Sequence, residues 1–164
     1  MNAETAIETI GHACISMLSS SLNLFLKEWV GRLKKDHGID FAVNFKKKGW
    51  FNGYKEIFEK LGLPISNCGA NLDVIQQITL ARNRVQHPEQ LTMLRVTHSK
   101  EDLKKFPKPL FAKELELKMA IARFSPSVRS TKEKIFEAIG QVETLCSWLE
   151  VKYLKMRPHL SKHK

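Results

Sequence analysis

One short run of this sequence, RNRVQH at residues 82–87, places three side chains with complementary chemistry close together. Arg82 carries a planar guanidinium, which matches the geometry of phosphate oxygens. Asn83 follows it directly and supplies an amide that can orient a neighbouring group by hydrogen bonding. His87 stands four residues after Asn83, and histidine is the side chain that most often transfers protons in catalysis. The cleavage of a phosphodiester requires proton carriers and a cation, and an amide can hold the phosphate or the imidazole in place.

The position of this run in the chain favours a common surface for the three side chains. Apolar spacing predicts a helix from about residue 71, and Pro88 ends that helix at residue 86 or 87. Since a helix turns by about 100° per residue, Asn83 and His87 lie about 40° apart, and Arg82 lies about 100° from Asn83. The three polar groups can therefore converge if the last turn of the helix unwinds, and Pro88 favours this unwinding.

Spacing between arginine and histidine is not specific by itself. Arg32 and His37 have the same separation, and Arg157 and His163 are one residue further apart. Only the run at residues 82–87 has an amide directly after the arginine and lies at the end of a short helix inside the chain. Context therefore distinguishes this candidate from the other two pairs.

Three further helices are predicted from apolar residues at steps of three and four. The first covers residues 5–36, the second covers residues 50–61, and the last begins at residue 125 or 126 and ends before Pro158. The first has the apolar stripe Ile7, Ile10, Cys14, Leu18, Leu22, Phe25, Trp29 and Leu33. Residues 89–125 show a short capped turn at 99–106 and a weak helical pattern after residue 112, so we expect an irregular insert. The expected fold is all-α, an antiparallel bundle of about four main helices.

The chain length of 164 residues predicts a single domain over 1–164, with a loose basic tail at 158–164. The 27 Lys+Arg residues exceed the 17 Asp+Glu residues by ten. This surplus attracts polyanions such as nucleic acid, although it also serves solubility alone. The three cysteines are far apart and lack metal-ligand spacing, which indicates free thiols and no metal. We expect a cytoplasmic protein without cofactor, signal peptide or membrane span.

The helical layout with RNRVQH at the end of its third main helix resembles the HEPN domains. Their motif is an arginine, a polar residue that is preferably Asn, Asp or His, and a histidine after four to six positions. Arg82, Asn83 and His87 match this motif residue for residue. The resemblance covers the helical layout of most of the chain, and its specific part is six residues long.

The resemblance implies a metal-independent endoribonuclease that works as a homodimer and cleaves RNA by attack of the 2′-hydroxyl. Arg82 then stabilises the charge on phosphorus, His87 transfers protons, and Asn83 holds the ring or the phosphate. Each chain has one such histidine, so two copies across a two-fold axis supply acid and base. The resemblance also suggests a toxin or phage-defence effector with an antitoxin or another protein partner. The alternative is a non-catalytic module that dimerises and binds RNA or protein.

Other basic residues are candidates for substrate binding. Arg84 lies inside the motif, and Lys46, Lys47 and Lys48 directly precede two aromatic residues at 50 and 51. Such a cluster can hold a phosphate backbone and stack a base. The alternative is a solvated loop whose neighbouring aromatic residues belong to the core. The lysines at residues 104–108 leave the same two interpretations open.

Overall fold

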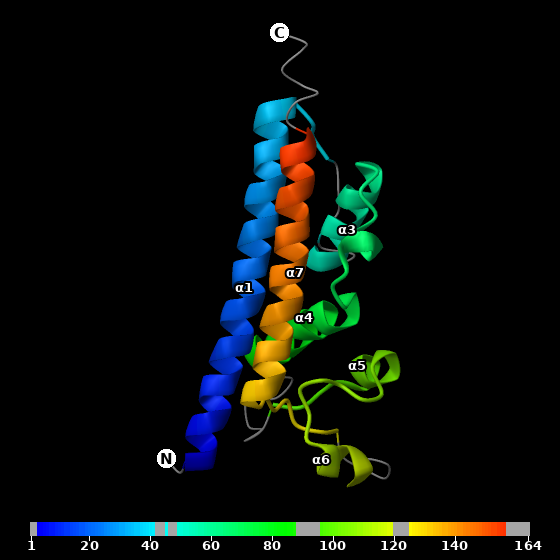
Figure 1. The fold of residues 1–164 in the computed structure, drawn as a ribbon. Coiled ribbons are helices and arrows are strands. Elements are labelled where there is room, and N and C mark those ends of the chain that lie inside the picture. Colours follow the sequence, from blue (N-terminus) through cyan, green and yellow to red (C-terminus); the bar gives the residue numbers. More distant parts are fainter. Residues whose placement is uncertain (1–2, 42–44, 46–48, 88–95, 120–124, 157–164) are drawn as a thin grey trace. The chain divides into compact units, whose positions relative to one another are not determined.

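The computed structural model describes residues 3–41, 45, 49–87, 96–119 and 125–156, and this part of the chain is all-α (Figure 1). The α-helices and one 3-10 helix, η1, are α1 (Ala3–His37), α3 (Trp50–Lys60), η1 (Ile65–Cys68), α4 (Leu72–Gln86), α5 (Lys100–Lys105), α6 (Glu114–Met119) and α7 (Lys132–Met156). The all-α class predicted from the sequence is confirmed. The expected insert contains α5 and α6, and an isolated bridge joins Thr97 to Ser127.

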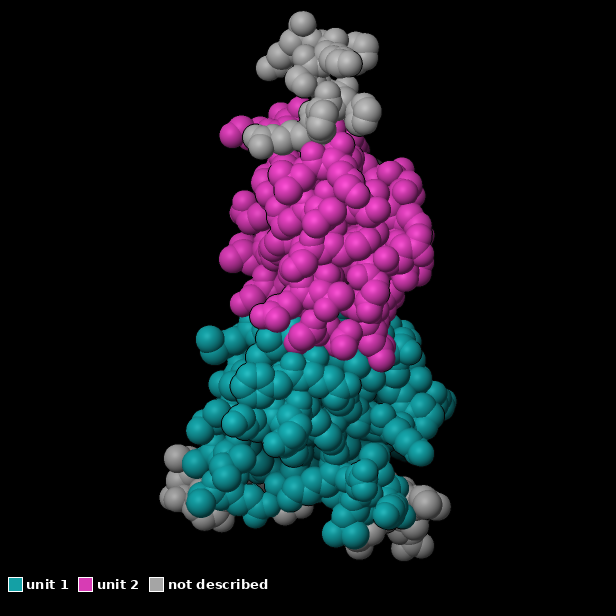
Figure 2. Space-filling view, viewed as in Figure 1, with its two compact units in different colours: residues 1–19, 73–139 teal, residues 20–72, 140–164 magenta. Residues whose placement is uncertain are grey.

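The chain divides into two compact units, each built from two separate segments (Figure 2). Unit 1 comprises Met1–Ser19 and Asp73–Ile139, and unit 2 comprises Ser20–Leu72 and Gly140–Lys164. The motif residues 82–87 and the described part of the insert therefore belong to unit 1. The expectation of one domain over 1–164 stays a prediction, and the basic tail at 158–164 lies outside the described residues.

Unit 2 is built around the second half of α1 and most of α7. The Trp29 indole donates a hydrogen bond to the Leu149 carbonyl at 3.1 Å, and the Tyr153 hydroxyl donates to the Asp36 carboxylate. These contacts advance in the same direction along both helices, so α1 and α7 run parallel here. The antiparallel order predicted for the main helices does not extend to this pair, because the chain between them returns through α3 to α6 before α7 begins.

The helix α1 carries apolar side chains on two faces, and the predicted stripe mixed the two. Ile15, Leu22 and Trp29 are fully or almost fully buried, whereas Ile7 and Ile10 are 65% and 63% exposed. The helices of a bundle turn their apolar stripes inward, and this expectation is wrong for Ile7 and Ile10. Steps of three and four define a stripe, but they do not select the buried face when both faces are apolar.

The last helix begins at Lys132, so the predicted start at residue 125 or 126 is wrong. The segment before it pairs with a distant part of the chain, since the Val128 amide donates to the Val96 carbonyl at 2.8 Å. It also passes close to α1. A Cβ atom at Gly11 would lie 2.1 Å from Ser130 Oγ, so the glycine permits this approach. Such tertiary contacts override the local helix-start signal of a serine and a proline.

Candidate functional site

The core face of α4 fixes the orientation of the motif. Ile75, Ile78 and Ala81 are buried in unit 1, and this leaves the opposite side of the same helix toward the surface. The last turn closes with a hydrogen bond of 2.9 Å from the His87 amide to the Asn83 carbonyl, so the expectation that this turn unwinds before Pro88 is wrong. α4 ends at Gln86, as the sequence predicted within one residue.

The three motif side chains lie at the surface end of α4. Asn83 and His87 are exposed, and Arg82 is partly exposed. The Arg82 guanidinium donates a hydrogen bond of 3.1 Å to Asn83 Oδ1, so these two side chains are brought together. Asn83 and His87 share one face through the helical rotation, about 40° apart. A large polyanion can reach all three groups from solvent.

Arg84, a candidate for substrate binding, is instead engaged within the protein. Its Nε donates a hydrogen bond of 2.8 Å to Asp102 Oδ2, and the two side chains are only 24% and 10% exposed. Asp102 is the third residue of α5 and also completes the capping box of Ser99. The capping pattern at Ser99 is visible in the sequence. The pairing of Asp102 with Arg84 is not, because these two residues are far apart in the chain.

Further hydrogen bonds hold the segment 98–111 in place within unit 1. The Leu110 amide donates to Gln77 Oε1 at 2.6 Å, which ties the segment to α4. Nε2 of the buried His98 lies 2.9 Å from the Phe111 carbonyl oxygen. Burial lowers the pKa of His98, while that hydrogen bond and the nearby Asp102 partly offset the effect. His98 therefore has a structural contact in the described part of the chain.

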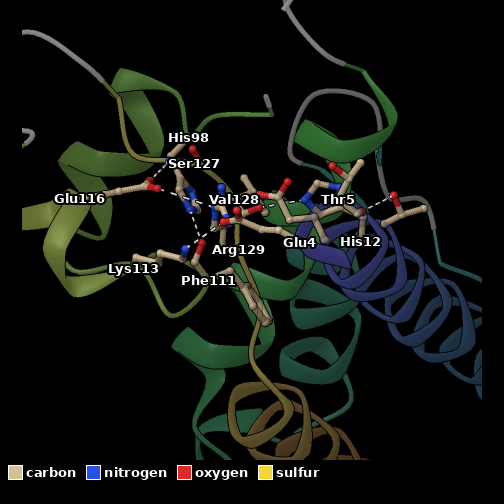
Figure 3. A network of polar contacts seen from close by, with 12 residues as sticks. Glu4, Thr5, His12, His98, Phe111, Lys113, Glu116, Ser127, Val128 and Arg129 are labelled. Carbon is tan, nitrogen blue, oxygen red and sulfur yellow. Dashed lines mark hydrogen bonds and ion pairs between the residues drawn. The ribbon is translucent and has the colours of Figure 1, made fainter. Parts of the chain in front are cut away.

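A second cluster of charges surrounds Arg129, which precedes α7 (Figure 3). Its guanidinium contacts Glu4 at 2.8 Å and Glu8 at 2.8 Å, and Glu116 lies 3.7 Å away. The Nε atom is not aligned for a hydrogen bond to Glu8, so that contact is ionic. Arg129 and its neighbour Lys113 hold the pKa of Glu4 below its usual value. The cluster was not predicted from the sequence, because residues 125–131 were expected to lie in a helix.

The Arg129 cluster borders a surface hollow of about 780 Å³ in unit 1. Its charged lining includes Glu4, Glu8, Lys113 and Lys134. On its wall, the Lys134 ammonium donates a hydrogen bond of 2.5 Å to the Ala112 carbonyl. Carboxylates balance the cations here, so the hollow has no surplus of either charge.

His12 contacts the same region, since its Nε2 lies 2.8 Å from the Val128 carbonyl oxygen. This contact joins α1 to the segment before α7. Lys46, Lys47 and Lys48 lie outside the described residues, so their predicted role in binding stays a prediction. Over the described ranges, no three His, Cys, Asp or Glu side chains gather closely enough to hold a metal ion.

Within the described chain, α1 is long and apolar enough over Ala3–Asp36 to cross a membrane by length and composition. A single helix of this kind near the N-terminus is weak support for a membrane span, because core helices of soluble proteins pass the same test. Exposed Ile7, Ile10, Met17 and Leu24 contribute to its apolar character. The predicted absence of a membrane span and the cytoplasmic location stay predictions.

We compared the chain with protein-family models, with characterised proteins and with solved structures, and none of them matches it. The resemblance to HEPN domains thus depends on residues 82–87 and on the helical layout.

Proposed function

We propose that this protein is a metal-independent endoribonuclease of the HEPN type, with Arg82, Asn83 and His87 as its catalytic residues. The observation that supports this most directly is the exposure of Asn83 and His87 on one face at the end of α4, with the Arg82 guanidinium hydrogen-bonded to Asn83. RNA is bulky and charged, so its phosphate can meet an imidazole at the surface but not one inside a core. The excess of basic residues, 27 against 17, supports a polyanionic substrate.

In the proposed reaction the 2′-hydroxyl of RNA attacks the adjacent phosphorus in line with the departing 5′-oxygen. A base takes the proton of the attacking hydroxyl, and an acid gives a proton to the 5′-oxygen as its bond to phosphorus breaks. His87 carries one of these protons. Arg82 faces the negative charge that develops on the phosphorane oxygens, and Asn83 holds the phosphate or the imidazole by hydrogen bonding. The products are a 2′,3′-cyclic phosphate and a free 5′-hydroxyl.

The reaction requires an acid and a base, whereas one chain provides one motif histidine. Two copies related by a two-fold axis supply both, so the active form is a homodimer. We also propose that the enzyme acts as a toxin or a phage-defence effector, which an antitoxin or another protein partner controls. These parts of the proposal follow from the resemblance to the family.

The test is RNA cleavage in excess EDTA by the purified chain and by His87→Ala. A positioned proton carrier contributes about 10² to 10⁴-fold to the rate, so we expect a loss of that size. Gln86→Ala is the matched control, because Gln86 is exposed in the same turn of α4 and has no assigned role. Circular dichroism should show the same helical content for all three proteins.

Two measurements separate the proposal from the non-catalytic alternative. The cleaved RNA should end in 2′,3′-cyclic phosphates, whereas 3′-hydroxyl ends would contradict the mechanism. Sedimentation should show a dimer at concentrations at which the chain is active, and activity from a strict monomer would exclude the shared site. RNA binding without cleavage would identify a non-catalytic module.

A further inference from the structure

The segment 99–108, which begins at the N-cap of α5, carries a local excess of positive charge beside the motif helix. Its four lysines are Lys100, Lys104, Lys105 and Lys108, and all are exposed. The segment also has two acidic residues, but the buried Asp102 is neutralised by Arg84. The four lysines are therefore balanced within the segment only by Glu101.

Two polar contacts place this segment along α4. Arg84 binds Asp102 at 2.8 Å, and Gln77 accepts a hydrogen bond from Leu110 at 2.6 Å, so the chain is attached to the motif helix within the segment and again two residues after it. Arg84 is three residues before His87, which corresponds to a rotation of about 60° around the helix. The segment is therefore attached to α4 at a position about 60° around the helix from His87 and about 100° from Asn83.

The segment is also rigid enough to present its charges in a fixed order. Its first turn has a capping box formed by Ser99 and Asp102, and the Phe106 amide donates to the Asp102 carbonyl at 2.8 Å. Pro109 and the fully buried Phe111 anchor the chain that follows. A surface held in this way loses little conformational entropy when a ligand binds.

An aromatic ring accompanies the cations. Lys105 Nζ lies 5.4 Å from the centroid of the Phe106 ring, and Phe106 is half-buried. Surfaces that bind single-stranded nucleic acid combine a basic track for the phosphates with aromatic rings on which bases stack. The other basic cluster of unit 1, around Arg129, lacks this character because glutamates neutralise it.

We propose that residues 100–108 form the surface that binds single-stranded RNA and leads it to the motif face. Lys100, Lys104, Lys105 and Lys108 hold the phosphate backbone there, and Phe106 offers a stacking face for a base. This inference rests on the proposed function for the position of the scissile phosphate at His87, and it adds the substrate form and the binding track. Lysine acts as a point charge toward phosphate, so binding is independent of base sequence and strongly dependent on salt.

The experiment measures binding of a fluorescein-labelled, unstructured RNA oligonucleotide by anisotropy in EDTA, with His87→Ala as the parent to prevent cleavage. The test variant adds Lys104→Gln, Lys105→Gln and Lys108→Gln. The control variant adds Lys27→Gln, Lys35→Gln and Lys155→Gln, which removes the same charge from exposed positions of α1 and α7.

Each lost phosphate contact lowers the slope of log affinity against log salt by about 0.7 for a single strand, so three lost contacts lower it by about 2. This corresponds to a loss of about 100-fold in affinity at about 0.1 M salt. The control variant should keep the slope of the parent. Equal slopes for the test and control variants, or no RNA binding by the parent at low salt, would overturn the inference.

The same lysine substitutions in the chain with an intact His87 separate the two proposals. If cleavage depends on His87 but not on the three lysines, the proposed binding surface is wrong and the proposed nuclease activity stands. If RNA binding depends on the lysines but the natural sequence cleaves no RNA, the proposed binding surface stands and the proposed nuclease activity is wrong. Thermal unfolding of each variant confirms that the exposed substitutions leave the fold unchanged.

Discussion

Breaking the ion pair between Arg84 and Asp102 should destabilise unit 1 by an amount that a double-mutant cycle can measure. The Nε to Oδ2 distance is 2.8 Å, and the side chains are 24% and 10% exposed. A hydrogen bond to a charged group contributes about 1.5 to 3 kcal/mol to stability. The larger loss of about 3 to 5 kcal/mol, measured for fully buried pairs, is an upper limit here because water reaches part of Arg84.

We therefore expect a loss of about 2 kcal/mol in the free energy of unfolding for Arg84→Gln and a similar loss for Asp102→Asn. Asparagine is chosen because it keeps the capping role at the start of α5. The double variant should lose less than the sum of the two, with a coupling energy of about 1.5 kcal/mol. Urea unfolding followed by circular dichroism gives all four values.

Arg82→Gln provides the control for this cycle. Its guanidinium is bonded to the exposed Asn83, so its removal should change stability by less than about 0.5 kcal/mol. If the double variant instead loses the sum of the two single losses, within about 0.5 kcal/mol, then Arg84 and Asp102 do not interact. That result would refute the role of Arg84 in an ion pair within the protein. A stable Arg84→Gln variant with weakened RNA binding would restore Arg84 as a substrate-binding residue.

Three further predictions follow from the charges and thiols of the structure. Because burial lowers the pKa of His98 from its usual 6.5, the folded state favours the neutral ring and stability is lost as the pH falls below about 6.5. Urea midpoints should fall less in His98→Gln than in the natural chain between pH 7 and 5, and an equal fall would contradict this role. Arg129 lowers the pKa of Glu4, so Arg129→Met should destabilise the chain at pH 7 and by less at pH 4, where more of this carboxylate is protonated. A loss that does not change with pH would count against the cluster. Burial raises the pKa of Cys146 to about 11, so about one thiol in a thousand is ionised at pH 8. Because Cys146 is half-buried, mass spectrometry should find it alkylated much more slowly in the folded protein than in urea, and equal rates would contradict this effect.

Sequence signals located the elements whose ends are set by local chemistry. α3 (Trp50–Lys60) and α4 (Leu72–Gln86) end within one residue of the predicted positions, because Gly62, Pro64 and Pro88 act on their own neighbours in the chain. The capped turn after Ser99 was predicted for the same reason. The end of a helix can be predicted from a few consecutive residues where glycine or proline restricts the backbone conformation.

Elements set by distant contacts were not predictable in this way. The segment before α7 is not helical, because the Val128 amide donates to the Val96 carbonyl and the Arg129 amide donates to the Phe111 carbonyl at 2.9 Å. The sequence shows no local sign of these partners. The face of α1 that enters the core is likewise decided by the helices around it, since apolar residues such as Ile10 and Ile15 lie on both faces.

Arg82 and Arg84 show how the same residue type acquires two roles within three positions. Two residues along a helix correspond to a rotation of about 200°, so the two guanidinium groups leave α4 in nearly opposite directions. Arg82 meets Asn83 near the surface, and Arg84 meets the buried Asp102. Since Asp102 also caps α5, an unpaired Arg84 would loosen both the insert and the lysines that it presents. The position of the proposed RNA surface therefore depends in part on this ion pair, and a substitution at Asp102 should weaken RNA binding without altering any residue that contacts RNA.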